Sequence, residues 1–249
     1  MNTFTSVYGP VSSWRYGTSL GIDPIGSVSI CSFNCVYCQL GEIEKQTLQR
    51  DVYIPTKTII SDLQGFAPWD VDIITLSGSG EPTLAANLGE IISQIKNMTN
   101  KPVLVLTNAT LLSDIQVRKE LALADKVSIK LDGLNTDQVR RINRPIGRIN
   151  FKDLIKGIKL FCEEYQGELG IQTMVLNDWN EKIKTEYLEL LNIIKPDEVQ
   201  LNTPSRPKPL KRELSGRENH QISSDRSLPV QVFKCVNKDI LAKLSEEIT

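Results

Sequence analysis

The strongest constraint on the fold is an alternation of short apolar segments with longer segments of helical periodicity. Six short segments are rich in Ile, Val, Leu and Thr and are bounded by turn residues, so each predicts a β-strand. Strands separated by helices form parallel βαβ units. Six such units predict either an incomplete α/β barrel or an open doubly wound sheet. The predicted strands are residues 19–23, 72–77, 103–108, 126–132, 169–176 and 198–203.

Four segments between these strands carry helix signals. Asn87, with Glu90 three residues later, resembles a capping box, which marks a helix N-terminus. Ser113 is the expected start of the next helix. Residues 151–161 carry an apolar stripe at helical spacing, and Asn180 is the expected cap of a fourth helix.

The C-terminal part of the chain differs in composition. Residues 203–230 are rich in Pro and charged residues and lack periodicity, which predicts a long loop. A final helix is expected at about residues 237–247. A chain of 249 residues is long enough for one sizeable domain. We therefore expect a core over residues 1–205, with a C-terminal loop and helix over residues 206–249 packed on it.

Polar residues recur on one face of three predicted strands, because side chains two positions apart share a face. A packed barrel interior carries Val, Ile and Leu instead. This face therefore predicts a lumen lined for a ligand, the alternative being individual polar residues satisfied within a core. The residues are Thr75 and Ser77, then Ser128, Lys130 and Asp132, and finally Gln200 and Asn202.

Composition excludes several classes of protein. Lys and Arg number 29 against 30 Asp and Glu, which argues against a DNA-coating protein. No run of 18 apolar residues and no signal peptide is present, so we expect no membrane partner. The single histidine, His220, excludes multi-histidine metal sites. Three of the five cysteines lie within eight positions, unlike a secreted disulfide framework, so we expect a reduced, cytoplasmic protein.

The clustered cysteines are Cys31, Cys35 and Cys38. Three thiolates without a natural fourth ligand suit a [4Fe–4S] cluster that has one iron left open. A structural zinc site remains an alternative, but it requires a fourth ligand. A redox dithiol at Cys35 and Cys38 is another, and it leaves Cys31 unexplained. The remaining zinc-ligand candidates are scattered singly: Cys162, Cys235 and His220.

The cysteine spacing, with Tyr37 before the last cysteine, resembles the signature of radical S-adenosylmethionine (SAM) enzymes. The segment SGSGEPT at residues 77–83 is similar to the family's "GGE" segment, which binds the amino group of SAM. The resemblance implies that the three cysteines hold three irons of a [4Fe–4S] cluster. It also implies that Gly78, Gly80 and Glu81 belong to the SAM site.

Other segments are similar to a compact radical SAM subgroup related to the tRNA wyosine synthases. This resemblance implies an α/β fold, the radical SAM (β/α)6 partial TIM-like barrel with parallel strands. Residues 1–30 contain no cysteine, so the second cluster of the archaeal-type wyosine synthases is not expected. The similar segments are residues 8–11, 19–24, 38–41, 107–111, 142–145 and 200–207.

The family's chemistry implies roles for further residues. In the family, a reduced cluster cleaves SAM and yields a 5′-deoxyadenosyl radical, which abstracts hydrogen from a substrate. Lys130 and Asp132 are the candidates for catalytic residues on the lumen face. The candidates for additional SAM contacts are Tyr37, Asn108, Ser128 and Asn202.

The partners implied are an electron donor of the flavodoxin or ferredoxin type and a substrate that the sequence does not identify. A tRNA base, a protein activated as a glycyl radical and a small metabolite all remain open. A non-catalytic zinc or iron–sulfur interaction module is the alternative of a different class. Basic residues that could form an anionic-substrate patch are Arg140, Arg141, Arg144, Arg148, Arg206, Lys208, Lys211 and Arg212.

Overall fold

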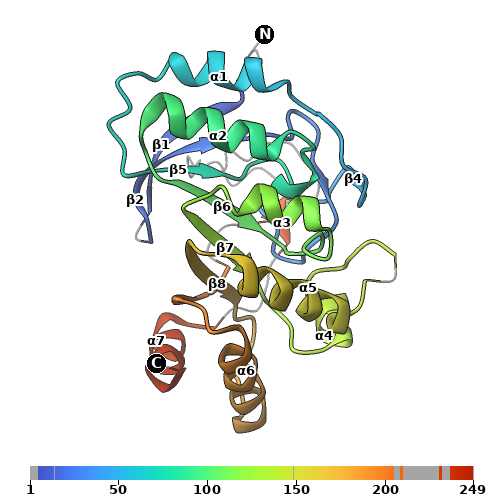
Figure 1. Ribbon diagram of the computed structural model, residues 1–249. Helices are drawn as coiled ribbons and strands as arrows, with labels where there is room; N and C mark the ends of the chain where they lie inside the picture. The colour runs from blue at the N-terminus through green and yellow to red at the C-terminus, as the bar shows by residue number, and fades with distance from the viewer. Residues whose placement is uncertain are drawn as a thin grey trace.

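The computed structural model describes residues 5–13, 15–147, 149–204, 208–209, 230–231 and 236–248. Its centre is a seven-stranded sheet with the order β1-β2-β5-β6-β7-β8-β9 (Figure 1). All neighbouring pairs are parallel except β1 and β2, which are antiparallel. The strands are β1 Val7–Ser13, β2 Gly17–Ile22, β5 Ile73–Leu76, β6 Val103–Thr107, β7 Lys126–Lys130, β8 Glu168–Met174 and β9 Glu198–Asn202.

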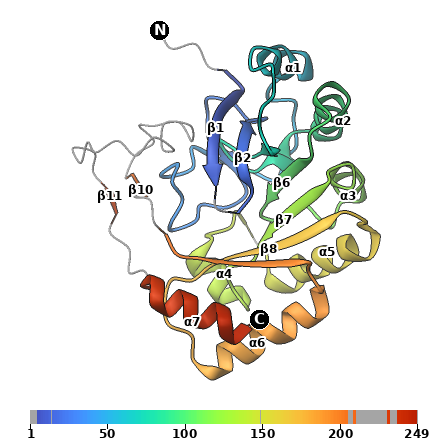
Figure 2. The same cartoon turned by 90° about the vertical axis from the view of Figure 1, so that its left-hand side faces the viewer.

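Helices follow one another along one side of the curled sheet (Figure 2). The fold is a half-barrel of the predicted partial TIM type, and the six predicted strands are confirmed within two residues at each end. The open doubly wound alternative is wrong, because it requires helices on both faces. The helices are α1 Thr56–Gln64, α2 Leu88–Thr99, α3 Ile115–Leu121, α4 Thr136–Ile142, α5 Phe151–Glu164, α6 Glu181–Ile194 and α7 Lys238–Ile248.

Shorter elements connect this framework. A two-stranded ladder joins β3 Ile30–Cys31 to β4 Lys45–Gln46, and a 3₁₀ turn η1 spans Pro82–Leu84. A second ladder joins β10 Lys208–Pro209 to β11 Val230–Gln231. Most of the predicted loop at 203–230 lies outside the described residues.

The helix starts show where local signals are overridden. Helix α2 begins after Asn87 as predicted, but the Asn87 side chain donates to Ile54 O and Thr56 Oγ1 instead of capping the helix, so the capping-box prediction is wrong. Asp114, not Ser113, caps α3. The Asn87 side chain is used in tertiary contacts, and the cap of α3 lies one residue later than predicted. The prediction for α6 is confirmed, since Asn180 Oδ1 accepts from the backbone N–H of Ile183.

The main core lies between the sheet and the helices. Buried strand residues such as Ile74, Val105 and Ile129 pack with helical residues such as Ile91 and Phe161. Burying one such side chain stabilises the fold by about 1.5–3 kcal/mol. The opposite face of the strands carries the polar residues, so amphipathic patterning separates core from lumen.

Helix α7 packs beside α6 (Figures 1 and 2), where Lys184 and Glu247 form an ion pair across the two helices. Val236 and Leu244 contribute to the main core. The division at residue 205 itself stays a prediction.

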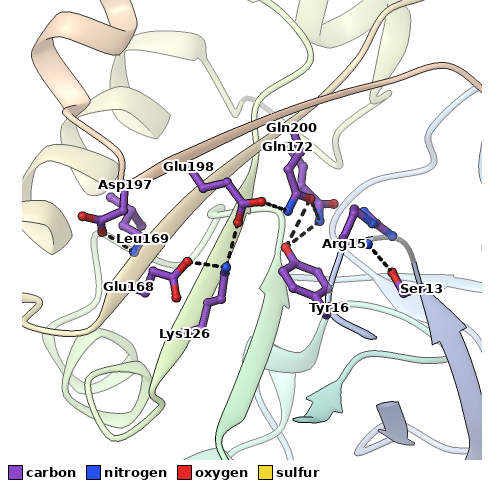
Figure 3. Close-up of polar contacts among 10 residues, drawn as sticks. All are labelled: Ser13, Arg15, Tyr16, Lys126, Glu168, Leu169, Gln172, Asp197, Glu198 and Gln200. Atoms are coloured by element: carbon purple, nitrogen blue, oxygen red, sulfur yellow. Dashed lines mark hydrogen bonds and ion pairs between the residues drawn. The ribbon is translucent and has the colours of Figure 1, made fainter. Parts of the chain in front are cut away.

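A polar network joins the two edges of the sheet at the amino ends of the strands (Figure 3). Tyr16, which directly precedes β2, donates through its hydroxyl to Gln200 Oε1 on β9 at 3.2 Å. Gln172 on β8 donates to the same hydroxyl at 3.3 Å. Lys126 lies 4.9 Å from the Tyr16 ring centroid and pairs with Glu198 and Glu168. The β1–β2 hairpin therefore closes this end of the half-barrel.

Candidate functional site

The cysteine loop is held between two other loops at the carboxyl ends of the parallel strands. Its first residues bond to the segment after β5, through Ile30 N to Ser79 O at 3.0 Å and Glu81 N to Ile30 O at 3.1 Å. Its middle bonds to the end of α4, where Asn34 N donates to Asn143 O at 2.9 Å. Backbone bonds on both sides therefore fix the loop in place.

The three cysteines of this loop form no disulfide bond and are partly buried. Burial raises the pKa of the Cys35 thiol to about 12, and the nearby negative charges of Asp132 and Cys38 add to this effect. Burial also raises the pKa of Cys31 well above its ordinary value, with Glu81 and Cys35 contributing. Three thiolates so close together repel one another, so this loop is suited to a cationic centre that neutralises them.

The donor set fits an iron–sulfur cluster. Among the residues that the structure describes, no three Cys, His, Asp or Glu side chains converge as ligands of one metal ion. A [4Fe–4S] cluster takes one thiolate per iron, so its cysteine sulfurs need not converge on a single point. The loop supplies three such thiolates and leaves one iron for another ligand.

The glycine segment after β5 is shaped by close backbone approaches. Gly78 has φ +122, and a Cβ there would lie 2.5 Å from Asp23 Cγ. A Cβ on Gly80 would lie only 1.7 Å from the carbonyl oxygen of Ile30. The sequence suggested that these glycines admit a ligand. The structure adds that they let this segment pack on the cysteine loop and on Asp23.

Glu81 fixes this segment to the next strand. Its carboxylate is buried and accepts from Thr107 Oγ1 at 2.6 Å, Asn108 N at 2.7 Å and both the backbone N–H and the hydroxyl of Thr83. Burial raises the pKa of Glu81, although these hydrogen bonds oppose that shift. These bonds hold the glycine segment against the end of β6, and a contact between Glu81 and SAM stays a prediction.

Asn108 links β6 to the cysteine loop. Its amide nitrogen donates to Ser32 Oγ at 2.9 Å and to Cys31 Sγ at 3.5 Å. Its carbonyl oxygen accepts from the backbone N–H and the hydroxyl of Thr110. A contact between Asn108 and SAM stays a prediction, and the observed contacts place the residue directly against a predicted iron ligand.

Asp132 is the centre of a buried polar network. Its fully buried carboxylate accepts from Lys130 Nζ at 2.9 Å, Met174 N at 2.8 Å, Asn143 Nδ2 at 2.7 Å and the Tyr37 hydroxyl. Lys130 also lies 5.1 Å from the Tyr37 ring centroid. Burial and the Asp132 charge raise the pKa of Tyr37 well above its ordinary value. With four donors already bound, Asp132 is arranged to hold neighbouring groups.

The remaining predicted site residues are Ser128 on β7 and Asn202 on β9. Ser128 is 2% exposed, and its hydroxyl has no hydrogen-bond partner among the described residues. Its neighbour on β8 is Gly170, and a Cβ added there would lie 3.4 Å from Ser128 Oγ, in ordinary van der Waals contact. Asn202 ends β9 and pairs with Met174 of β8. An unsatisfied buried hydroxyl is uncommon and is consistent with a ligand contact.

Sequence reasoning missed one residue of this region that the structure makes prominent. Asn143 is 2% exposed and contacts Cys35, Asp132 and the backbone of the cysteine loop. It lies in the INRP segment at 142–145, which carried a family similarity but no assigned role. That similarity was the one available signal.

The basic residues are only partly described. Arg140, Arg141 and Arg144 are exposed around the end of α4. For Lys208 only the backbone is described. Cys162, on α5, packs against the main core, and burial raises the pKa of its thiol to about 11. Arg148, Arg206, Lys211, Arg212, His220 and Cys235 lie outside the described residues.

Comparisons with known proteins identify the family and the fold. The radical SAM superfamily matches residues 26–191. A UPF0026 protein of Synechocystis sp. is 60% identical over 99% of this chain and 93% of its own length. A UPF0026 protein of Methanocaldococcus jannaschii is 33% identical over 82% of this chain, which spans 64% of that relative.

A solved structure, native anSMEcpe with bound AdoMet and Kp18Cys peptide, has a similar fold. Its TM-score is 0.57 at 18% identity, over 76% of this chain and 52% of the other. The fold, the cysteine loop and the family match define the class of protein: this chain is a member of the radical SAM superfamily, whose enzymes use a [4Fe–4S] cluster and SAM. Within that superfamily it belongs to the UPF0026 family.

The comparisons leave the relation to wyosine synthases as a prediction. Within the described ranges, none of the helices has the length and apolar character needed to cross a bilayer.

Proposed function

We propose that this protein is a radical SAM enzyme whose single [4Fe–4S] cluster is held by Cys31, Cys35 and Cys38. The observation that carries the proposal is the loop itself. Three cysteines without disulfide bonds lie on one loop, and backbone hydrogen bonds join that loop to the glycine segment after β5. When bound, the reduced cluster supplies the electron that splits SAM into methionine and a 5′-deoxyadenosyl radical.

The chain's own residues bind and orient SAM in this proposal. Backbone groups of Gly78 and Gly80 hold the amino group, and Glu81 keeps their segment rigid through its bonds to Thr107 and Asn108. The unsatisfied hydroxyl of Ser128 supports a further polar contact in the lumen. Tyr37 packs near the cluster, and Asn202 reaches the adenine or the substrate.

Lys130 and Asp132 act in the proposal next to the reacting groups. The bonds of Asp132 to Tyr37 and Asn143 support a positioning role, while Lys130 balances the carboxylate charge. Hydrogen bonds among Tyr16, Gln172 and Gln200 close the half-barrel at the amino ends of its strands. This closure supports the exclusion of water from the lumen, which radical chemistry requires.

The electron donor is proposed to be a flavodoxin or ferredoxin, and the location cytoplasmic, where thiols stay reduced. The substrate is a hydrogen donor bound in the lumen. The exposed Arg140 and Arg144 support a tRNA substrate as the second candidate. Tight tRNA binding that Arg140→Ala and Arg144→Ala together abolish is the expected result for this candidate, and no binding at low salt contradicts it.

Anaerobic reconstitution with iron and sulfide tests the main proposal. The wild-type protein is expected to become brown and to hold about four irons, one of them without a cysteine ligand. After reduction with dithionite it should convert SAM to 5′-deoxyadenosine. Replacing any of Cys31, Cys35 and Cys38 by Ala is expected to abolish both properties. Cys162→Ser, which alters a cysteine packed in the core, is the matched control and should retain both.

A colourless protein that holds one zinc ion and is inert toward SAM would contradict the proposal. That result would favour the non-catalytic interaction module instead.

A further inference from the structure

Asn143 directs an amide hydrogen at the sulfur of Cys35. The residue follows α4, its Nδ2 lies 2.7 Å from Asp132 Oδ2 and 3.4 Å from Cys35 Sγ, and it is 2% exposed. A carboxamide nitrogen carries two hydrogens. The short bond to Asp132 takes one hydrogen and thereby orients the other toward Cys35, with Tyr37 Oη beside it at 3.5 Å.

The amide has little freedom to turn away. Asp132, which anchors it, is itself held by Met174 N and Lys130 Nζ. The backbone carbonyl of Asn143 accepts from Asn34 N, one residue before Cys35. The side chain and the backbone of Asn143 therefore hold the same stretch of the cysteine loop.

Resting on the proposed function, in which Cys35 is a cluster ligand, we propose that Asn143 is a positioning residue that raises the reduction potential of the cluster. An N–H···S bond withdraws charge from the thiolate and so stabilises the reduced, more negative cluster. Lys130 acts in the same direction, because its cation balances the Asp132 carboxylate beside Cys35.

The two residues make signed predictions about the potential. Asn143→Ala removes the donor and should lower it. Asn143→Leu removes the donor and keeps the side-chain volume, so it should lower the potential by a similar amount. Lys130→Met leaves the Asp132 charge unbalanced and should lower it as well. A merely structural role would reduce the amount of bound iron without lowering the potential of the cluster that remains.

The measurement is a redox titration of the reconstituted full-length protein without SAM, followed by electron paramagnetic resonance of the reduced cluster. In Asn143→Ala the ratio of reduced to oxidised cluster at a fixed poise should fall about threefold to tenfold, the range expected for one hydrogen bond. A tenfold fall corresponds to about 59 mV for one electron. Asn180→Ala is the matched control, because it removes the cap of α6 and should leave the ratio unchanged.

The outcomes separate this inference from the proposed function. If Asn143→Ala and Asn143→Leu hold a full cluster with the wild-type potential, the role of Asn143 is overturned while the proposed function stands. If Asn143→Ala cannot retain iron, Asn143→Leu, which leaves no cavity, decides by the same measurement, and an unchanged potential overturns the inference. A wild-type protein that assembles no cluster overturns the proposed function and this inference together.

Discussion

The two ends of strand β7 carry the same kind of ion pair in different surroundings. At the carboxyl end, Lys130 pairs with Asp132, whose side chain is fully buried and accepts from four donors. At the amino end, Lys126 pairs with Glu168 and Glu198, whose side chains are 51% and 32% exposed (Figure 3). Water therefore screens the two glutamates more than it screens Asp132.

The difference indicates that the two ends of the barrel have different roles. At the carboxyl ends, buried bonds and backbone approaches hold the cysteine loop, the glycine segment and Asp132 in one arrangement. At the amino ends, partly exposed ion pairs and the Tyr16 hydroxyl close the half-barrel, and small shifts of these side chains are tolerable. Substitutions at the carboxyl ends should therefore cost far more stability than matched ones at the amino ends.

Gly80→Ala should give the largest effect. The new Cβ would lie 1.7 Å from Ile30 O, and a backbone atom cannot move aside as a side chain can. Overpacking of this kind costs about 3 kcal/mol or more, and the cysteine loop should lose its iron. Urea unfolding and iron content measure both effects.

Gly147→Ala is the matched control for that substitution. Gly147 has φ +64, but a Cβ added there would meet no atom within 4 Å among the described residues, so only backbone strain of about 1 kcal/mol is expected. Equal losses of stability and of bound iron in the two variants would show that the close approach of Gly80 to Ile30 is not the reason for the loss.

Glu81→Ala should cost about 3 kcal/mol, because it leaves the buried donors of Thr83, Thr107 and Asn108 without their acceptor. Thr107→Val removes one of these donors and also the acceptor of the Ala109 N–H, so it should cost about 1–2 kcal/mol. Chemical denaturation measures the loss of unfolding free energy in each variant. A loss in Glu81→Ala no greater than that in Thr107→Val would mean that the carboxylate does not organise these loops.

The sequence predicted the parallel strands well because each one buries a continuous apolar face against helices, a pattern that is local. It did not predict β1, an antiparallel strand interrupted by Gly9 and Pro10 and largely exposed in its second half. It also missed α1, which buries only Thr56, Ile59 and Leu63, and α4, which buries only Val139. Elements with so few buried positions leave a weak periodic signal.

The site residues also form two groups, those that short sequence motifs indicated and those that depend on tertiary structure. The thiols and the glycine segment occupy short motifs, so the sequence alone indicated them. Asn143 contacts Cys35 across 108 positions, and that contact exists only because the end of α4 packs on the cysteine loop. The required close approach of Gly80 to Ile30 likewise depends on tertiary structure.

At the other end of the barrel, Tyr16→Phe should cost about 1 kcal/mol. The variant keeps the ring beside Lys126 and loses only the hydroxyl bonds with Gln200 and Gln172. Thermal unfolding measures the loss, and iron content should stay at the wild-type level. A loss of iron in this variant would mean that the two ends of the barrel are coupled, contrary to the division proposed above.

The smallest expected effect is that of Glu198→Gln, and its pH dependence identifies its cause. Burial alone would raise the pKa of Glu198, but its bonds with Lys126 and Gln200 outweigh burial and hold that pKa below its ordinary value. A carboxylate whose folded pKa is lowered stabilises the protein fully above its unfolded pKa, about 4.3, and loses this contribution as the pH falls through the folded value. Glu198→Gln should therefore cost about 0.5 kcal/mol at pH 7.

That cost should vanish in acid, where Glu198 is protonated in both states, and should shrink in 1 M salt, which screens exposed charges. Unfolding free energies of both proteins across this pH range, at low and high salt, provide the measurement. The cost of Lys130→Met, at the buried pair, should change little with salt. An equal salt dependence at the two pairs would show that water reaches Asp132 as it reaches Glu198, and the rigid arrangement at the carboxyl ends would then lack its physical basis.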